Sequence, residues 1–157
     1  MMEQISMRLG IHEDFAELAA IISSSPAWTC YGIDCSKAMK LFEQMKDTIY
    51  VAEINGKLVG FVTIRIDGVG NIGAYIRMVA VDQVFRNSGI GAQLIDYISG
   101  IATAENVPNI FLICSVDNIK AQSFYERNAF KQVGIIKDLV SIGHDEIFYR
   151  KCLGTLY

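Results

Sequence analysis

The chain has 157 residues, of which 52% are hydrophobic, and its 14 basic and 17 acidic residues give a formal net charge of -3. This length and composition predict a single domain over residues 1–157 with a substantial core. The acidic balance argues against a nucleic-acid partner, which usually requires a basic surplus. No apolar run reaches the roughly 18 residues that span a bilayer. Because residues 1–4 also lack the basic start of a secretory leader, we expect a cytoplasmic protein with no membrane partner.

The cysteines and histidines show neither zinc-site spacing nor a Cys-x-x-Cys pair; they are Cys30, Cys35, Cys114, Cys152, His12 and His144. We therefore predict no metal site and mainly structural cysteines. Cys114 lies in an apolar run and is predicted to be a buried thiol. A disulfide between Cys30 and Cys35 stays open as an alternative, although a reducing compartment disfavours it.

The first half of the chain predicts two helices inserted into a meander of antiparallel strands. Alternating apolar residues indicate strands, and apolar residues at i, i+3, i+4 and i+7 indicate helices. Asp34 is a suitable cap for the second helix, and Asn55-Gly56 is the strongest short hairpin signal. The predicted order is strand 5–9, helix 12–25, helix 34–46, strand 48–54, strand 58–66, a glycine-rich turn 67–73 and strand 74–81.

The second half alternates strands and helices. The predicted order is helix 89–104, strand 110–114, helix 118–128, strand 130–136 and strand 146–152. Strand 74–81, the helix after it and strand 110–114 form a βαβ unit, so these two strands should be parallel. The whole chain therefore predicts a mixed sheet with helices on both faces.

The segment that opens helix 89–104 reads Arg86-Asn87-Ser88-Gly89-Ile90-Gly91. Its glycines permit close backbone approach, and the free amides at a helix N-terminus favour an anion. Arg86 adds a permanent positive charge. A diphosphate is the expected occupant, and a tight turn with a solvent-facing arginine is the alternative.

Two other phosphate-binding motifs do not fit this segment. A dinucleotide fingerprint needs a third glycine where this chain has Leu94, and it must follow its strand directly. Here four residues, 82–85, separate the strand from Arg86. A P-loop needs a Gly-Lys-Ser or Gly-Lys-Thr sequence, which does not follow.

A second block at residues 118–130 reads Asn-Ile-Lys-Ala-Gln-Ser-Phe-Tyr-Glu-Arg-Asn-Ala-Phe. The Arg-x-x-Gly-x-Gly start of one helix, followed by this Asn-x-x-Ala-x-x-Phe-Tyr-Glu block, resembles the GNAT superfamily of N-acetyltransferases over about residues 74–131. The resemblance implies an α/β acyl-CoA N-acyltransferase (GNAT) fold. This fold has a mixed seven-stranded sheet and four helices, and strands 4 and 5 splay apart to admit the cofactor. It also implies acetyl-CoA as that cofactor and acetyl transfer to a primary amine by direct attack in a ternary complex.

The resemblance assigns cofactor-binding residues by position. Strand residues 78–81 would lie along the pantetheine arm, and the amide of Val79 would stabilise the thioester oxygen as negative charge develops. The loop that follows would hold the pyrophosphate, and three residues of the second block would lie at the pantetheine. The complete set is Val79, Val81, Arg86, Asn87, Ser88, Gly89, Ile90, Gly91, Ala92, Asn118, Phe124 and Tyr125.

Tyr125 occupies the general-acid position of the family, where it would protonate the departing coenzyme A thiolate; a plain core aromatic is the alternative. A tyrosine titrates near about 10 and a thiol near about 8.5, so the hydroxyl keeps its proton until the thiolate develops. The general base is not evident, because neither strand 74–81 nor strand 110–114 carries a carboxylate. Deprotonation through water beside Ser115 or Tyr75 is the remaining route.

Two departures from the family pattern affect these loops. Ala129 stands where the family usually has a glycine that ends the helix in a left-handed conformation. Asn128 tolerates that conformation and is expected to take over the turn. Asn87-Ser88 replaces the commoner Gly-Lys, which removes a positive charge but keeps the backbone amides.

The acceptor site is the least specified part of the sequence. Candidate contacts are Trp28, Tyr31, Tyr75 and Tyr149, with Cys30 and Arg150 beside them; a hydrophobic lid or dimer contact explains the first two equally well. The expected partner is a small-molecule or peptide amine, and a homodimer is left open. A non-catalytic acyl-CoA-binding regulatory or sensor module is the alternative function. A nucleotide-binding protein with a wholly parallel sheet is the third hypothesis.

Overall fold

The computed structural model describes residues 4–157, so most of the segment used to predict the absence of a leader lies outside the described residues. The chain forms two compact units. The first unit comprises Met1–Ile64 and Met78–Tyr97, and the second comprises Arg65–Arg77 and Ile98–Tyr157. Within the described residues, no helix is long and apolar enough to cross a membrane.

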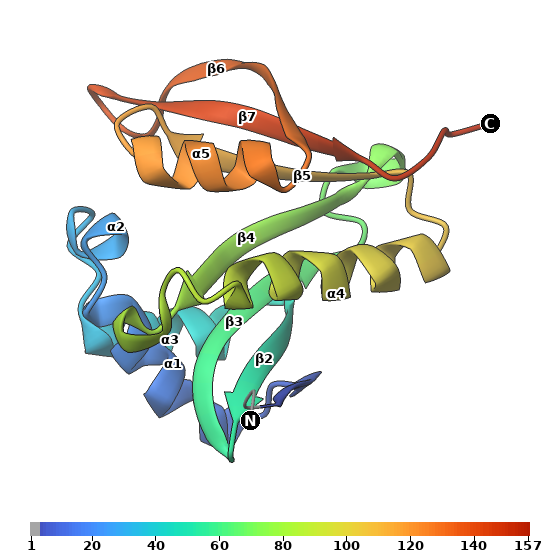
Figure 1. Ribbon diagram of the computed structural model, residues 1–157. Helices are drawn as coiled ribbons and strands as arrows, with labels where there is room; N and C mark the ends of the chain where they lie inside the picture. The colour runs from blue at the N-terminus through green and yellow to red at the C-terminus, as the bar shows by residue number, and fades with distance from the viewer. Residues whose placement is uncertain (1–3) are drawn as a thin grey trace. The chain divides into compact units, whose positions relative to one another are not determined.

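The helices and strands follow the predicted order (Figure 1). They are β1 (Ile5–Leu9), α1 (Phe15–Ser23), α2 (Pro26–Thr29), α3 (Cys35–Gln44), β2 (Thr48–Ile54), β3 (Lys57–Arg65), β4 (Ala74–Val81), α4 (Ile90–Ala104), β5 (Asn109–Ser115), α5 (Ile119–Arg127), β6 (Phe130–Ser141) and β7 (His144–Cys152). Both β4 and α4 begin in one unit and end in the other. The fold has one short helix more than the four predicted, because Ser25 is extended and Pro26 starts α2 at the first helical position.

The seven strands form one sheet in the order β1-β2-β3-β4-β5-β7-β6. The pairs β1–β2, β2–β3, β5–β7 and β6–β7 are antiparallel, and β4–β5 is parallel. This confirms the predicted mixed sheet and contradicts the wholly parallel sheet that the nucleotide-binding hypothesis requires. The β4–β5 ladder joins Ala74 to Ile110 and Tyr75 to Phe111, at the start of β4.

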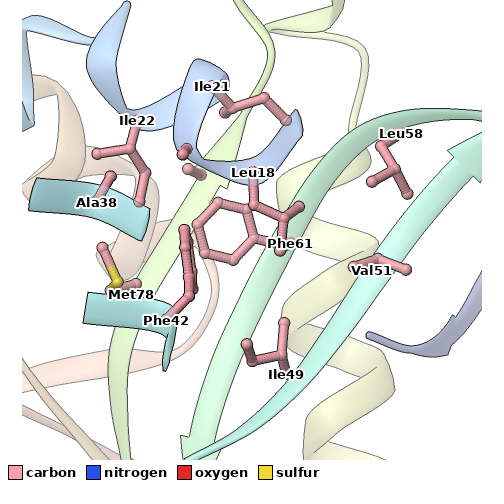
Figure 2. Close-up of a cluster of buried hydrophobic side chains, with 12 residues drawn as sticks. Leu18, Ile21, Ile22, Ala38, Phe42, Ile49, Val51, Leu58, Phe61 and Met78 are labelled. Atoms are coloured by element: carbon pink, nitrogen blue, oxygen red, sulfur yellow. The ribbon is translucent and has the colours of Figure 1, made fainter. Parts of the chain in front are cut away.

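The first unit is built around a core between α1, α3 and the strands (Figure 2). Leu18 of α1 and Phe42 of α3 meet Phe61 of β3, whose ring lies 5.4 Å from that of Phe42. Side chains alternate across a strand, so Phe61 faces α1 and α3 while Gly60 faces α4. A Cβ on Gly60 would lie 2.9 Å from the Ala80 carbonyl and 3.3 Å from Leu94. This glycine therefore lets β3 approach β4 and α4 closely.

Local signals in the first unit act as predicted. The Asp34 side chain caps α3 by accepting a 2.8 Å hydrogen bond from the Lys37 amide. Asn55 and Gly56 both have positive φ, at 52° and 78°, which is the backbone of the tight hairpin turn between β2 and β3.

Arg8 of β1 was not singled out from the sequence, yet it pairs with both Asp14 and Glu53 at 2.6–2.9 Å. The three side chains join β1, β2 and the turn that leads into α1, and the Arg8 guanidinium lowers the pKa of Asp14.

The second unit places α5 against the β5-β7-β6 part of the sheet. Tyr125 of α5 packs against Phe130 and the fully buried Tyr149, at ring distances of 5.7 and 6.1 Å. β6 and β7 are longer than predicted, because the strand continues past Lys137 through an irregularity where Asp138 has a φ of 53°. The hairpin then turns at Ile142 and Gly143.

The helix α5 ends differently from the prediction. Ala129 itself adopts the left-handed conformation, with a φ of 68°, whereas Asn128 has a φ of -98°. The expectation that Asn128 takes over this turn is wrong. Asn128 instead stabilises the helix end, because its side-chain amide donates to the Phe124 carbonyl at 2.8 Å. The tertiary fold thus holds an alanine in a conformation that favours glycine.

Replacing Ala129 by glycine is therefore expected to stabilise the protein. A non-glycine residue held in the left-handed conformation destabilises the folded protein by roughly 1–2 kcal/mol. Glycine removes this cost, but its greater freedom in the unfolded chain offsets about 0.4–1 kcal/mol of the gain. We expect Ala129→Gly to raise the free energy of unfolding by up to about 1 kcal/mol, measured by urea denaturation. Ser123→Gly, in the middle of helix α5, is the control and should destabilise the protein instead. Destabilisation by Ala129→Gly would contradict the conformation assigned to this residue.

All four cysteines are free thiols; Cys114 is buried, as predicted, and Cys30, Cys35 and Cys152 are exposed. The disulfide left open between Cys30 and Cys35 is absent from the structure. Within residues 4–157, no three His, Cys, Asp or Glu side chains lie where they could together hold a metal ion.

Candidate functional site

The loop between β4 and α4 lies in the first unit and has the backbone of an anion-binding turn. Asn87 and Gly89 both have positive φ, at 62° and 84°, and α4 begins at Ile90. The Gln93 amide donates to the Gly89 carbonyl, so the amides of residues 90–92 precede the first bond of the helix. Such amides have no partner within their helix, and the helix dipole adds positive potential there. The loop therefore presents donors suited to a phosphate group.

Asparagine and serine keep this turn without the glycine and lysine that the family commonly has. Asparagine is among the few non-glycine residues that adopt positive φ readily, which explains how Asn87 occupies this position. The Ser88 hydroxyl donates to the Phe85 carbonyl and closes the turn. The side chains therefore shape the loop, and the backbone supplies its donors.

Arg86 is exposed, but two of its donors are already bonded within the first unit. Its Nε donates to the Val81 carbonyl at 3.3 Å, and its Nη2 donates to the Ser25 hydroxyl at 3.1 Å. Arg86 thus connects the end of β4, the loop and the start of α2. An arginine has five donors, so the charge and the remaining donors stay available to an anion.

The end of β4 alternates as the sequence predicts. Met78 and Ala80 are buried in the core with α1 and α3, and Val79 and Val81 are half-buried on the other face. The Val81 carbonyl, which the resemblance assigned to the pantetheine arm, accepts the hydrogen bond from Arg86. The side chains of Val79 and Val81 thus lie on the face of β4 that points away from this core.

The second unit contains the proposed acid. Asn118 precedes α5 and caps it, because its side-chain oxygen accepts a 3.1 Å hydrogen bond from the Ala121 amide. The cap fixes the helix that carries Phe124 and Tyr125, whose rings are 5.3 Å apart. Tyr125 is half-buried.

Burial raises the pKa of Tyr125 well above its usual value, and the neighbouring Cys114 and Tyr75 raise it further. Burial, with a contribution from Glu146, also raises the pKa of the Cys114 thiol to about 12. Both groups therefore stay protonated and neutral throughout the physiological range. A neutral phenol is the protonation state that a general acid needs.

Other predicted site residues of the second unit have structural partners. Tyr149 is fully buried and donates to the Glu126 carboxylate at 3.2 Å. Arg150 donates to the Asn109 side chain at 2.6 Å. The Ser115 hydroxyl accepts from the Asp117 amide at 3.2 Å.

A carboxylate that the sequence analysis did not single out lies beside Ser115. Glu146 of β7 is only 3% exposed and pairs directly with Ser115 in the β5–β7 register. Directly opposite residues of antiparallel strands project from the same face, with Cβ atoms about 5 Å apart. Glu146 lies outside strands 74–81 and 110–114, where a base was predicted to be absent. The sequence signal for this residue is an acidic side chain directly before the apolar pair Ile147-Phe148 in a predicted strand.

The predicted residues fall into two groups. The first unit holds Trp28, Tyr31, Val79, Val81 and the loop 86–92, and Trp28 packs against the core there. The second unit holds Tyr75, Ser115, Asn118, Phe124, Tyr125 and Tyr149. Among the second group, Tyr125 interacts with both Tyr75 and Tyr149.

Known proteins resemble this chain in sequence and fold. Residues 15–130 match the Acetyltransferase (GNAT) family. An uncharacterized N-acetyltransferase of Methanocaldococcus jannaschii is 34% identical over 101 residues, covering 62% of this chain and 45% of that protein. An N-alpha-acetyltransferase of Sulfolobus acidocaldarius is 29% identical over 106 residues, covering 61% of this chain and 63% of that protein.

Among solved structures, the PaiA N-acetyltransferase of Thermoplasma acidophilum in complex with coenzyme A has a TM-score of 0.72 and 20% identity. The match covers 95% of this chain and 99% of that one, and it shows a shared fold. The chain spans about half to two thirds of the two curated relatives described above. Because the family match covers most of its length, this chain belongs to the GNAT acetyltransferase family.

Proposed function

We propose that this chain is an N-acetyltransferase that uses acetyl-CoA and transfers the acetyl group to a primary amine. The observation that carries the proposal is the loop of residues 86–92, where positive φ at Asn87 and Gly89 frees the first amides of α4. Family membership supports the assignment, as does the coenzyme A bound by the relative of shared fold.

The residues assigned to the cofactor would each have a separate role. The amides of residues 87–92 and the charge of Arg86 would hold the pyrophosphate, and Val79 and Val81 would pair with the pantetheine arm. Asn118 and Phe124 are the further residues that the family pattern assigns to the pantetheine. Asn118 would contact the pantetheine while capping α5, which uses its side-chain oxygen and leaves its side-chain NH2 available.

The reaction would proceed by direct attack. The amine nitrogen attacks the thioester carbonyl carbon, the new C–N bond forms, and the C–S bond then breaks. The Val79 amide would stabilise the negative oxygen. The Tyr125 hydroxyl would protonate the departing thiolate, and its raised pKa supports this role because it keeps the phenol neutral.

The proton on the attacking amine needs an acceptor. We propose that it passes through Ser115, or through a water beside Ser115 or Tyr75, toward Glu146. The supporting observation is the register, which pairs Ser115 with the buried Glu146. A carboxylate in this position would restore the base that β4 and β5 lack.

The acceptor that we would test first is a peptide N-terminus. The S. acidocaldarius relative is named an N-alpha-acetyltransferase, which supports this choice. Trp28 and Tyr31 are half-buried and would supply aromatic contacts to an ammonium group. A panel of peptides, polyamines and amino acids, assayed for thiol release, would identify the acceptor class.

Gly89→Val is expected to weaken acetyl-CoA binding about 10- to 100-fold in calorimetry. Gly89 has a φ of 84°, which a β-branched residue resists, so the loop would lose the arrangement of its amides. Open space surrounds the position, so a steric clash is not the cause. Gly100→Ala, inside α4 and also in open space, is the control and should leave affinity unchanged. Equal affinity for Gly89→Val, or no acetyl-CoA binding by the unmodified chain at millimolar concentration, would refute the proposed cofactor site.

Glu146→Gln is expected to lower kcat/KM about 10- to 100-fold near neutral pH. The loss should shrink as the pH rises, because a larger fraction of the amine then loses its proton to solvent. The measurement is a pH–rate profile of thiol release, with the exposed Asp117→Asn as the control. A loss that is constant across the pH range would argue for a structural role of Glu146.

The alternative is a non-catalytic acyl-CoA-binding module, which the absence of a carboxylate on β4 and β5 favours. It predicts acetyl-CoA binding without thiol release for every amine tested. Turnover that is lost in Tyr125→Phe while binding persists would exclude it.

A further inference from the structure

The first unit has a surface cavity of about 310 Å³ beside α1. One wall is a stripe of α1, and the other is the start of β3 together with the residue that follows β4. The residues that the two walls contribute include Glu17, Ile21, Ser24, Lys57, Leu58 and Asp82. The floor is apolar, because Ile21 and Leu58 are buried in the core of this unit (Figure 2). None of these residues was predicted to contact the cofactor or the acceptor, so the cavity is a separate feature of the molecule.

The two walls of the cavity are fixed to each other by hydrogen bonds. The Asp82 amide donates to the Val59 carbonyl at 2.9 Å, which holds the end of β4 against β3. The Gln83 side chain donates to the Ser24 carbonyl and joins the same segment to the end of α1. The fold itself therefore sets the positions of Asp82 and Ser24 on opposite sides of the cavity.

The rim of the cavity carries charges of both signs that do not pair with each other. Among residues 4–157, the side chains of Glu17 and Lys57 form no hydrogen bond and no ion pair. The Lys57 ammonium lies 5.2 Å from the centre of the Phe85 ring. The Asp82 carboxylate accepts from the Val84 amide at 3.0 Å with one oxygen, which leaves the other oxygen for a ligand. One molecule in the cavity could therefore contact an ammonium group and two carboxylates.

These charges restrict the chemical class of the ligand. An inorganic anion would be repelled by Glu17 and Asp82, and a polyamine or a metal ion would be repelled by the Lys57 ammonium. A wholly apolar molecule would take the charged groups out of water without giving them a partner. A small zwitterion with an apolar part matches both the rim and the floor. The volume lies at the lower end of the roughly 300–1,000 Å³ that ligand pockets span, which also favours a small molecule.

We propose that this cavity binds a free α-amino acid with an apolar side chain. The ligand carboxylate would bind the Lys57 ammonium, and the ligand ammonium would bind Glu17 and the free oxygen of Asp82. The apolar side chain of the ligand would lie on Ile21 and Leu58. Because the contacting residues are distinct from those of the proposed transfer site, binding requires neither acetyl-CoA nor an acceptor.

Calorimetric titration of the full chain with leucine, without acetyl-CoA, tests this site. We expect saturable binding with a Kd of no more than about 1 mM. Glu17→Gln and Lys57→Gln should each weaken leucine binding at least about fivefold, because each removes one charged contact. The matched controls are Glu13→Gln and Lys40→Gln, which change exposed residues of the same unit outside the cavity and should leave the affinity unchanged.

Two analogues and one cavity-filling substitution test how the ligand is held. N-acetyl-leucine lacks the ammonium and leucinamide lacks the carboxylate, so each should bind at least about tenfold more weakly than leucine. Ala20 lines the cavity and is exposed, so Ala20→Phe should fill the space and reduce leucine binding at least about tenfold. Ala16→Phe is the control, because Ala16 is an exposed residue of α1 outside the cavity.

Three results would overturn the proposal. The first is no binding of leucine at about 10 mM. The second is an affinity for leucinamide or N-acetyl-leucine equal to that for leucine. The third is leucine binding that Glu17→Gln, Lys57→Gln and Ala20→Phe all leave unchanged, which would place the amino acid at another site, such as that of the acceptor amine. Because the titration involves neither acetyl-CoA nor thiol release, its outcome is independent of the proposed function.

Discussion

Replacing Tyr125 by phenylalanine is expected to lower kcat by about 10²- to 10⁴-fold, the range that general acid catalysis contributes. The substitution removes the hydroxyl that would protonate the coenzyme A thiolate and leaves the ring. The ring contacts with Phe124, Phe130 and Tyr149 should therefore persist. Steady-state thiol release gives kcat, and calorimetry should find acetyl-CoA affinity changed by no more than about twofold.

The pH dependence follows from the raised pKa of Tyr125. A tyrosine whose pKa lies above the ordinary value of about 10 stays protonated to higher pH. Activity should then rise as the acceptor amine loses its proton, with no decline from Tyr125 ionisation up to about pH 10. Tyr97→Phe is the matched control, because Tyr97 is an exposed tyrosine of α4 that packs edge-on against Tyr50. Unchanged turnover in Tyr125→Phe would remove Tyr125 from the reaction.

Replacing Gly73 by alanine is expected to destabilise the protein by about 2–3 kcal/mol, the usual cost of an added methyl group that the surroundings cannot absorb. A Cβ at Gly73 would lie 2.6 Å from the Asn109 carbonyl and 2.7 Å from the Phe111 ring. The φ of Gly73, 167°, is extended and suits any residue, so the clash alone causes the loss. Thermal unfolding should show a midpoint lower by about 5–10 °C.

The surroundings of Gly73 explain why they cannot move aside. The Asn109 side chain donates to the Ile72 carbonyl at 2.8 Å and accepts from Arg150 at 2.6 Å. The next residue, Ala74, begins the parallel pairing of β4 with Ile110 of β5. Gly134→Ala is the control, because no atom lies within 4 Å of the added methyl group. Equal midpoints for the two variants would show that the close approach at Gly73 is absent in solution.

Much of the fold could be predicted because its signals are local. The Asp34 cap, the Asn55-Gly56 turn and the alternation in β4 depend on neighbouring residues, and each appears where the sequence placed it. The two motifs that identified the family are also short, at residues 86–91 and 118–130. Their spacing was enough to indicate the GNAT fold, which the family match confirms.

Features that depend on distant partners were missed or misplaced. The burial of Tyr149 beside Glu126 was not predicted, because it depends on strand pairing and on α5. Ala129 was expected to avoid positive φ, but the junction between α5 and β6 imposes it. Glu146 stood out locally only as an acidic residue beside an apolar pair, and only the register of β7 against β5 brings it opposite Ser115.

The sequence by itself determined the order of the elements, the turn at Arg86–Gly91 and the position of Tyr125 on a capped helix, because caps, turns and periodicity act over a few residues. Only the tertiary structure decided which groups are buried together. In the folded chain, Tyr75 and Cys114 lie near Tyr125. The Arg86 guanidinium donates to the Val81 carbonyl and the Ser25 hydroxyl, and β6 is exposed at the edge of the sheet. Burial and charge act through space, and they set the protonation of Tyr125 independently of distance along the chain.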